Sequence, residues 1–173
     1  MINSGEKDFC FRIFRNSTSL DIDLLLEFLR ERSSNKVILQ ILDPNLLISV
    51  KQLQSAVYHT EKSFESKRNI ARTRANEFLI RLAGKRQISN ALKLLGIKES
   101  SQYLLIIAFG TTLENNKKEL EKFVKQFSLI EYEAKNSLPI SKLKVLSTYY
   151  ECQEDLIEIE KTALEKIASV EIL

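Results

Sequence analysis

The sequence predicts a single α+β domain over residues 1–173, with a small mixed β-sheet packed against several α-helices. The chain has 173 residues, of which 44% are hydrophobic and 28% charged, and this length and balance suit one hydrophobic core. Short segments with the alternating pattern of strands are separated by segments with the period of helices. We find no long apolar run and no leader peptide in the sequence, so we expect no membrane segment and no secretory signal.

Local patterns define the elements of the first half. Alternating apolar residues predict a strand at the start, and apolar residues spaced by three and four predict the helices. Ser49 with Gln52 forms a capping box, Thr73 is a second N-cap, and Gly84 is placed to end the helix that Thr73 begins. The expected elements are a strand over 8–15, a helix over 20–32, a strand over 36–42, and helices over 49–66, 73–83 and 88–95.

The second half begins with the most apolar stretch of the chain. Tyr103–Phe109 has the length and composition of an interior strand. Thr111 or Thr112 then caps a helix whose apolar side ends at Phe127 and whose lysines face water. The remaining expected elements are an edge strand over 128–135, a short helix containing Ile140, Leu143 and Leu146, and an acidic helix over 155–168.

The net charge of +3 is unevenly distributed. Residues 62–98 contain 10 basic and 2 acidic side chains, whereas residues 150–173 contain 2 basic and 7 acidic ones. Such asymmetry within one domain indicates a polyanionic partner for the basic segment.

The sequence offers few groups for catalysis. It has one histidine, His59, and two distant cysteines, Cys10 and Cys152, and its four glycines form no phosphate-binding loop. We therefore expect no catalytic residue, no metal, no cofactor and no small-molecule substrate, with His59 on a helix surface. A small enzyme that uses His59 or a carboxylate remains an alternative.

The basic segment is the candidate nucleic-acid interface. Arg74, Glu77 and Arg81 are spaced by three and seven, which places them on one exposed stripe of a helix. The stripe leads to a basic turn, where the N-terminus of the next helix favours phosphate. We expect the preceding loop to close around the same ligand. The candidate residues are Arg68, Asn69, Arg72, Arg74, Arg81, Lys85, Arg86 and Gln87.

Two observations favour the alternative that the basic segment is only a solvated surface. A lysine-rich protein can present a solvated basic face without binding RNA. The sequence also shows no aromatic platform among the basic residues, because Phe64 and Phe78 fall on apolar helix faces.

The acidic C-terminal helix has apolar residues around too much of its circumference for one buried stripe. It therefore fits either a docking surface for a protein partner or a helix central to the core. The candidate anchors for a partner are Leu164, Ile167, Val170 and Ile172.

Residues 73–97 contain a distinctive motif. An acidic residue precedes apolar residues, a small-Gly-x-Arg-Gln-Ile turn, and an alanine-containing helix that ends in Gly-Ile. The motif residues are Glu77, Ala83, Gly84, Arg86, Gln87, Ile88, Ala91, Gly96 and Ile97. This pattern resembles the small regulatory subunit of the KEOPS complex, the kinase-binding (PRPK-binding protein) family of archaea and eukaryotes. The similarity is clear over residues 36–109, and Ala83 stands where serine is common.

The resemblance implies a noncatalytic subunit of the complex that makes threonylcarbamoyladenosine next to the tRNA anticodon. It implies two partners, the small kinase/ATPase subunit, which the chain binds and regulates, and the 3′ CCA end of tRNA. Arg86 and Gln87 match motif positions, whereas the other basic candidates rest on charge and spacing. It also implies a cytoplasmic location, nuclear too in a eukaryote, and favours an archaeal origin. The alternative is a protein-interaction module that regulates a kinase without touching RNA.

Overall fold

A computed structural model describes residues 9–16, 21–31, 36–132 and 143–172. These residues form a small sheet and several helices, which confirms the predicted α+β class. The chain divides into two compact units. Unit 1 comprises Met1–Asp43 and Gly96–Glu133, and unit 2 comprises Pro44–Leu95 and Ala134–Leu173. The expected single domain over residues 1–173 stays a prediction.

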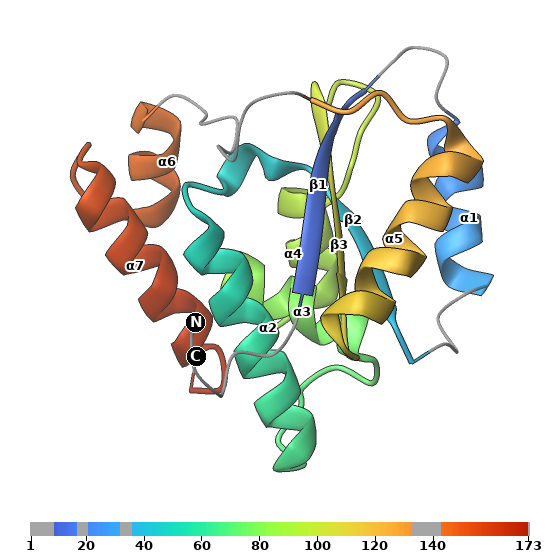
Figure 1. The fold of residues 1–173 in the computed structure, drawn as a ribbon. Helices are drawn as coiled ribbons and strands as arrows, with labels where there is room; N and C mark the ends of the chain where they lie inside the picture. Colours follow the sequence, from blue (N-terminus) through green and yellow to red (C-terminus); the bar gives the residue numbers. More distant parts are fainter. Residues whose placement is uncertain (1–8, 17–20, 32–35, 133–142, 173) are drawn as a thin grey trace. The chain divides into compact units, whose positions relative to one another are not determined.

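Unit 1 contains a three-stranded sheet of β1 (Phe9–Arg15), β2 (Ile38–Leu42) and β3 (Tyr103–Phe109). The strand order is β1-β3-β2, and β3 is antiparallel to both neighbours (Figure 1). The expected mixed sheet was therefore wrong. The first two strands run in the same direction, but β3 lies between them and runs the opposite way, so no parallel pair forms.

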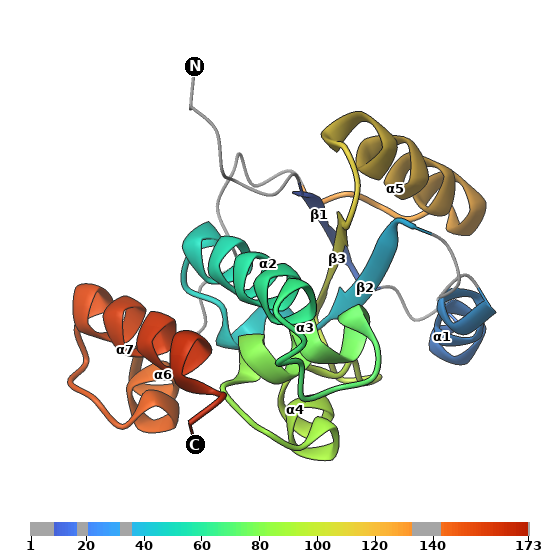
Figure 2. The ribbon, with the colours of Figure 1, turned by 90° about the horizontal axis from the view of Figure 1, so that it is seen from below.

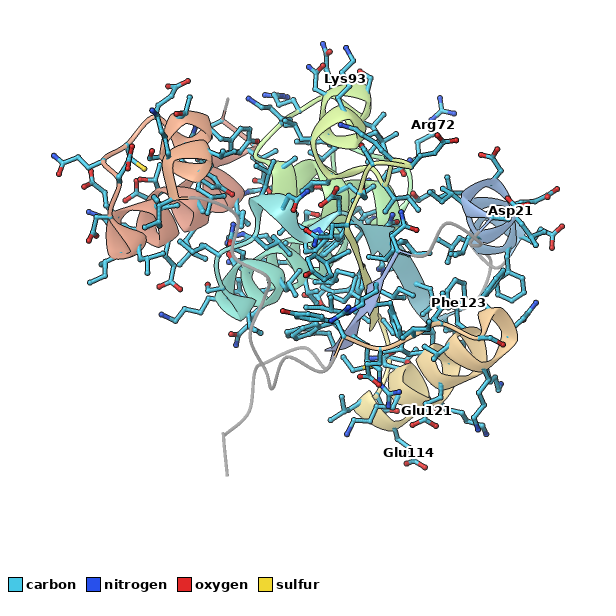
Figure 3. All side chains as sticks on the ribbon, turned by 90° about the horizontal axis from the view of Figure 1, so that it is seen from above. Asp21, Arg72, Lys93, Glu114, Glu121 and Phe123 are labelled. Carbon is cyan, nitrogen blue, oxygen red and sulfur yellow. The ribbon has the colours of Figure 1, made fainter. Side chains whose placement is uncertain are left out.

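Two helices cover one face of this sheet. Helices α1 (Ile22–Glu31) and α5 (Leu113–Phe127) pack on a cluster that includes Leu104 and Ile106 of β3. Figure 3 shows Phe123 on the inner side of α5, with Glu114 on its outer side. Phe123 is fully buried, as the helical period predicted.

The segment after α5 runs beside β1 without forming a full strand. Tyr132 N donates to Ile13 O at 2.8 Å, and an isolated bridge joins Phe14 and Glu131. The edge strand expected over 128–135 is thus reduced to one bridge, and residues 133–135 lie outside the described part.

Unit 2 is helical in its described part. Its elements are η1 (Pro44–Leu46), α2 (Val50–Glu65), α3 (Arg74–Ala83), α4 (Ile88–Leu95), α6 (Leu143–Tyr150) and α7 (Leu156–Ser169). Helix α3 contacts α2, α4 and α7, and α7 also packs against α2 and α6 (Figure 2). Ile140, expected in the helix before α7, lies outside the described residues.

The predicted caps of unit 2 are present. Thr73 Oγ1 accepts a hydrogen bond from Asn76 N at 3.3 Å and starts α3. Gly84 ends α3 with φ of +58°, a left-handed conformation that glycine adopts without strain. At the start of α2, Gln52 Oε1 accepts from Ser49 N at 3.2 Å.

Candidate nucleic-acid interface

The basic residues of unit 2 fall into two groups at the two ends of α3. We call residues 66–73, between α2 and α3, the basic loop, and residues 84–87, between α3 and α4, the basic turn. Ten residues of α3 separate the two, and this corresponds to about 15 Å along the helix axis. The expectation that both groups close around the same ligand stays a prediction.

Buried contacts hold the basic loop in a fixed conformation. The backbone N–H groups of Ile70 and Ala71 donate to Glu77 Oε2 at 2.8 and 2.7 Å, and Glu77 is fully buried. The amide of Asn69 donates to Ala71 O at 2.9 Å, so it is used within the loop. Exposed cations extend from this fixed backbone: Lys67, Arg68 and Arg72, the last of which is labelled in Figure 3.

Arg74 is only partly available to a ligand. Its Nε lies 3.2 Å from Glu61 Oε1, and its guanidinium lies 4.9 Å from the centre of the Phe64 ring. The side chain keeps 44% exposure. Because a carboxylate already compensates much of its charge, Arg74 contributes less to an anion site than the cations of the basic loop.

Arg81 does not belong to the interface. Its side chain is fully buried, at 0% exposure, and Nη2 lies 2.9 Å from Glu77 Oε1 and 2.7 Å from Glu171 Oε1. The expected exposed stripe of Arg74, Glu77 and Arg81 was therefore wrong for its last two members. Since α2 and α7 both contact α3, they cover the side of the helix where Arg81 lies.

The basic turn presents its cations outward. Arg86 and Gln87 are exposed, and Lys85 is half-buried. Gln87 O accepts from Asn90 N and Ala91 N at 3.1 Å each, which starts α4 directly after the turn. Arg86 Nη1 donates at 3.4 Å to the backbone oxygen of Glu171, which is an uncharged acceptor.

Two residues from the C-terminal part of unit 2 contact the end of α3 and the start of the basic turn. The Tyr149 hydroxyl of α6 donates to Ala83 O at 2.8 Å. Burial raises the pKa of Tyr149 to about 12, so the hydroxyl keeps its proton for this bond. On α7, Lys166 Cβ lies 3.0 Å from where a Cβ on Gly84 would be.

The sequence pattern does not reveal these C-terminal residues as neighbours of the basic turn. Tyr149, Lys166 and Glu171 are more than 60 residues from the turn that they contact, so no spacing rule joins them to it. An aromatic ring of α6, that of Tyr149, lies beside one cation of the basic turn. Lys85 Nζ lies 5.8 Å from the centre of its ring.

The expected partner anchors on the C-terminal helix separate into two kinds. Ile167 and Val170 are fully buried in unit 2, so their assignment to a docking surface was wrong. They pack inward because α7 lies against α2, α3 and α6. Leu164 is half-buried, and Ile172 is 85% exposed, so these two can still meet a partner.

His59 lies half-buried on α2, with its ring against that of Tyr58. Burial and then the charge of Arg81 lower the pKa of its imidazole, which is therefore neutral near pH 7. Within the described residues, no three His, Cys, Asp or Glu side chains are grouped as metal ligands would be. No helix in the described part is both long enough and apolar enough to cross a membrane.

A comparison with known proteins identifies a family to which the sequence is similar. A family profile described as "Kinase binding protein CGI-121" matches residues 14–171. A 69-residue segment is 38% identical to the "KEOPS complex subunit Cgi121" of Pyrococcus abyssi (strain GE5 / Orsay). That segment is 38% of this chain and 39% of the relative, so the match spans about two fifths of the relative's length. Because the profile covers most of the sequence, including the basic loop and the basic turn, the chain belongs to the CGI-121 family of kinase-binding proteins.

Proposed function

We propose that this chain is a noncatalytic subunit of a KEOPS tRNA-modifying complex, in which it binds and regulates the small kinase/ATPase subunit. Family membership over residues 14–171 supports the kinase as partner. The name of the archaeal relative supports the complex. The activity itself, synthesis of threonylcarbamoyladenosine, then belongs to other subunits of the assembly.

The second part of the proposal is that unit 2 binds tRNA at its single-stranded 3′ CCA end. One observation carries it. The cations of the basic loop and the basic turn extend from backbone that buried contacts hold in place, and no described carboxylate pairs with them. Cations that are already positioned lose little freedom when they meet phosphates. The residues concerned are Lys67, Arg68, Arg72, Lys85 and Arg86.

The spacing of the two groups suits a single strand. The basic loop and the basic turn flank the ten residues of α3, which correspond to about 15 Å of helix axis. An extended strand can contact both groups through different nucleotides. A subunit that holds the 3′ end in this way would orient the distant anticodon loop for the catalytic subunit.

Binding of tRNA by the Arg86→Glu variant tests the proposal. We expect the variant to lose most of its affinity for tRNA in an electrophoretic assay, because the substitution places a negative charge at the centre of the basic turn. The matched control is Lys125→Glu on α5 of unit 1, an exposed lysine with the same change of charge. Removal of the CCA end from the tRNA should weaken binding by the parent protein.

The alternative is a kinase-regulating interaction module without RNA contact. Unchanged affinity in Arg86→Glu, or equal affinity for intact and trimmed tRNA, would favour that module. Kinase binding should persist in Arg86→Glu under either function, and co-purification measures it.

A further inference from the structure

The basic turn lies beside a lysine of the acidic C-terminal helix. Lys85 Nζ lies 5.8 Å and Lys166 Nζ 5.9 Å from the centre of the same ring, that of Tyr149. The hydroxyl of Tyr149 is bonded to Ala83 O, so the ring is fixed relative to the turn. Two ammonium groups from distant parts of the sequence thus lie near the ring of Tyr149, and that of Lys166 also lies 6.0 Å from the centre of the Tyr150 ring.

Three carboxylates of the same C-terminal segment lie next to cations other than Lys166. Glu171 Oε1 lies 2.7 Å from Arg81 Nη2, and Glu160 Oε2 lies 2.8 Å from Lys51 Nζ. Glu165 is adjacent to Lys166 in sequence, but its Oε1 lies 3.9 Å from Lys161 Nζ. Lys166 therefore carries a charge that no described carboxylate compensates, within a segment that is acidic overall.

The path of the Lys166 side chain depends on Gly84. Lys166 Cβ and Cδ lie 3.0 and 3.8 Å from where a Cβ on Gly84 would be, so the stem of the lysine passes directly over the glycine. Packing against the turn fixes the stem, and the ring of Tyr149 attracts the ammonium group. Lys85 and Lys166 are like charges near one ring, and an anion close to both would reduce their repulsion.

We propose that Lys166 is a phosphate-binding residue for single-stranded RNA, and that Lys85, Arg86 and Lys166 form one composite anion site around Tyr149. This inference rests on the proposed tRNA binding. The ligand group is a phosphodiester of the bound strand, which Lys and Arg contact without reading the base. The site combines cations from the α3–α4 turn with one from α7, so part of the RNA surface comes from the acidic end of the chain.

The test is tRNA binding by Lys166→Met in the full chain. Methionine keeps an unbranched stem over Gly84 and removes the charge. We expect the dissociation constant to rise by about fivefold, and the slope of log affinity against log salt to fall by about 0.7, the value for one contact to a single strand. Lys166→Arg should keep the parent affinity. Lys161→Met is the matched control, because Lys161 lies on the same helix and is paired with Glu165.

The outcomes separate this inference from the proposed function. If Arg86→Glu loses tRNA and Lys166→Met binds like the parent, the composite site is wrong and the tRNA function stands. If Arg86→Glu keeps full affinity, the tRNA function itself is wrong. Should Lys166→Met melt at a lower temperature than the parent, Lys166→Gln applies the same test, since it also removes the charge and keeps a polar tip. An unchanged salt slope in that variant overturns the inference.

Discussion

A buried arginine joins three parts of unit 2 from which the exposed cations extend. Arg81 binds Glu77, and Glu77 also accepts from the N–H groups of Ile70 and Ala71 in the basic loop. Arg81 binds Glu171 at the C-terminal end as well. The network thus connects the basic loop, α3 and the end of α7. A buried ion pair adds little net free energy of folding by itself. The network therefore acts mainly by holding the basic loop, α3 and the end of α7 in fixed positions relative to one another.

Two arginines five residues apart should therefore respond differently to the same substitution. Arg81→Gln leaves the buried carboxylate of Glu77 without its cation, and we expect the free energy of unfolding to fall by about 3 kcal/mol. Arg86→Gln changes an exposed side chain and should alter stability by less than about 0.5 kcal/mol. Urea denaturation of both variants measures the difference. Equal stability of the two variants would contradict the buried position of Arg81.

At the scale of the element, the ends of helices were predictable and their covered faces were not. Thr73 and Gly84 are local signals, and α3 begins and ends where they indicate. The spacing of seven residues between Arg74 and Arg81 also correctly places both on α3. It could not show that α2 and α7 lie against α3, which determines whether a charged side chain meets water or the core.

Helix α7 illustrates the same limit. Its broad apolar coverage fitted either a docking surface or a core helix, and the structure shows both kinds of residue on it. Ile159, Ile167 and Val170 are fully buried, whereas Ile157 and Ile172 are largely exposed. The most exposed apolar residues therefore lie at the two ends of this segment, and Leu164 between them is half-buried. The contacts of α7 with its neighbouring helices determine this, and the sequence does not show them.

Substitutions on the C-terminal segment should separate folding from kinase binding. Ile167→Arg places a charge in the core of unit 2, and we expect it to lower the melting temperature strongly and to lose the kinase through unfolding. Ile172→Arg changes a side chain that is 85% exposed and should leave the melting temperature unchanged while it weakens co-purification with the kinase. Ile130→Arg, which changes an isoleucine of unit 1 that is 63% exposed, is the matched control. Full kinase binding by Ile172→Arg would remove this residue from the interface.

At the scale of the whole molecule, the arrangement of charge matters more than its sum. Two cations of unit 1 lie beside carboxylates: Lys122 Nζ lies 2.6 Å from Glu119 Oε1, and Arg12 Nη2 lies 3.7 Å from Glu121 Oε1. In unit 2, Arg81 and Glu77 cancel each other inside the core, and five of the other cations of residues 62–98 lie on the basic loop and the basic turn. The net charge of +3 describes neither unit.

Two double variants with the same net charge test whether this arrangement determines RNA binding. Arg68→Glu with Arg86→Glu changes the basic loop and the basic turn of unit 2, whereas Lys117→Glu with Lys118→Glu changes the exposed face of α5 in unit 1. At physiological salt the Debye length is about 8 Å, so only charges close to the bound strand contribute strongly. We expect the first variant to lose tRNA binding and the second to stay within about twofold of the parent, measured by filter binding over a range of salt concentrations. Equal losses in both variants would show that tRNA responds to the total charge of the chain, and would contradict a localised interface on unit 2.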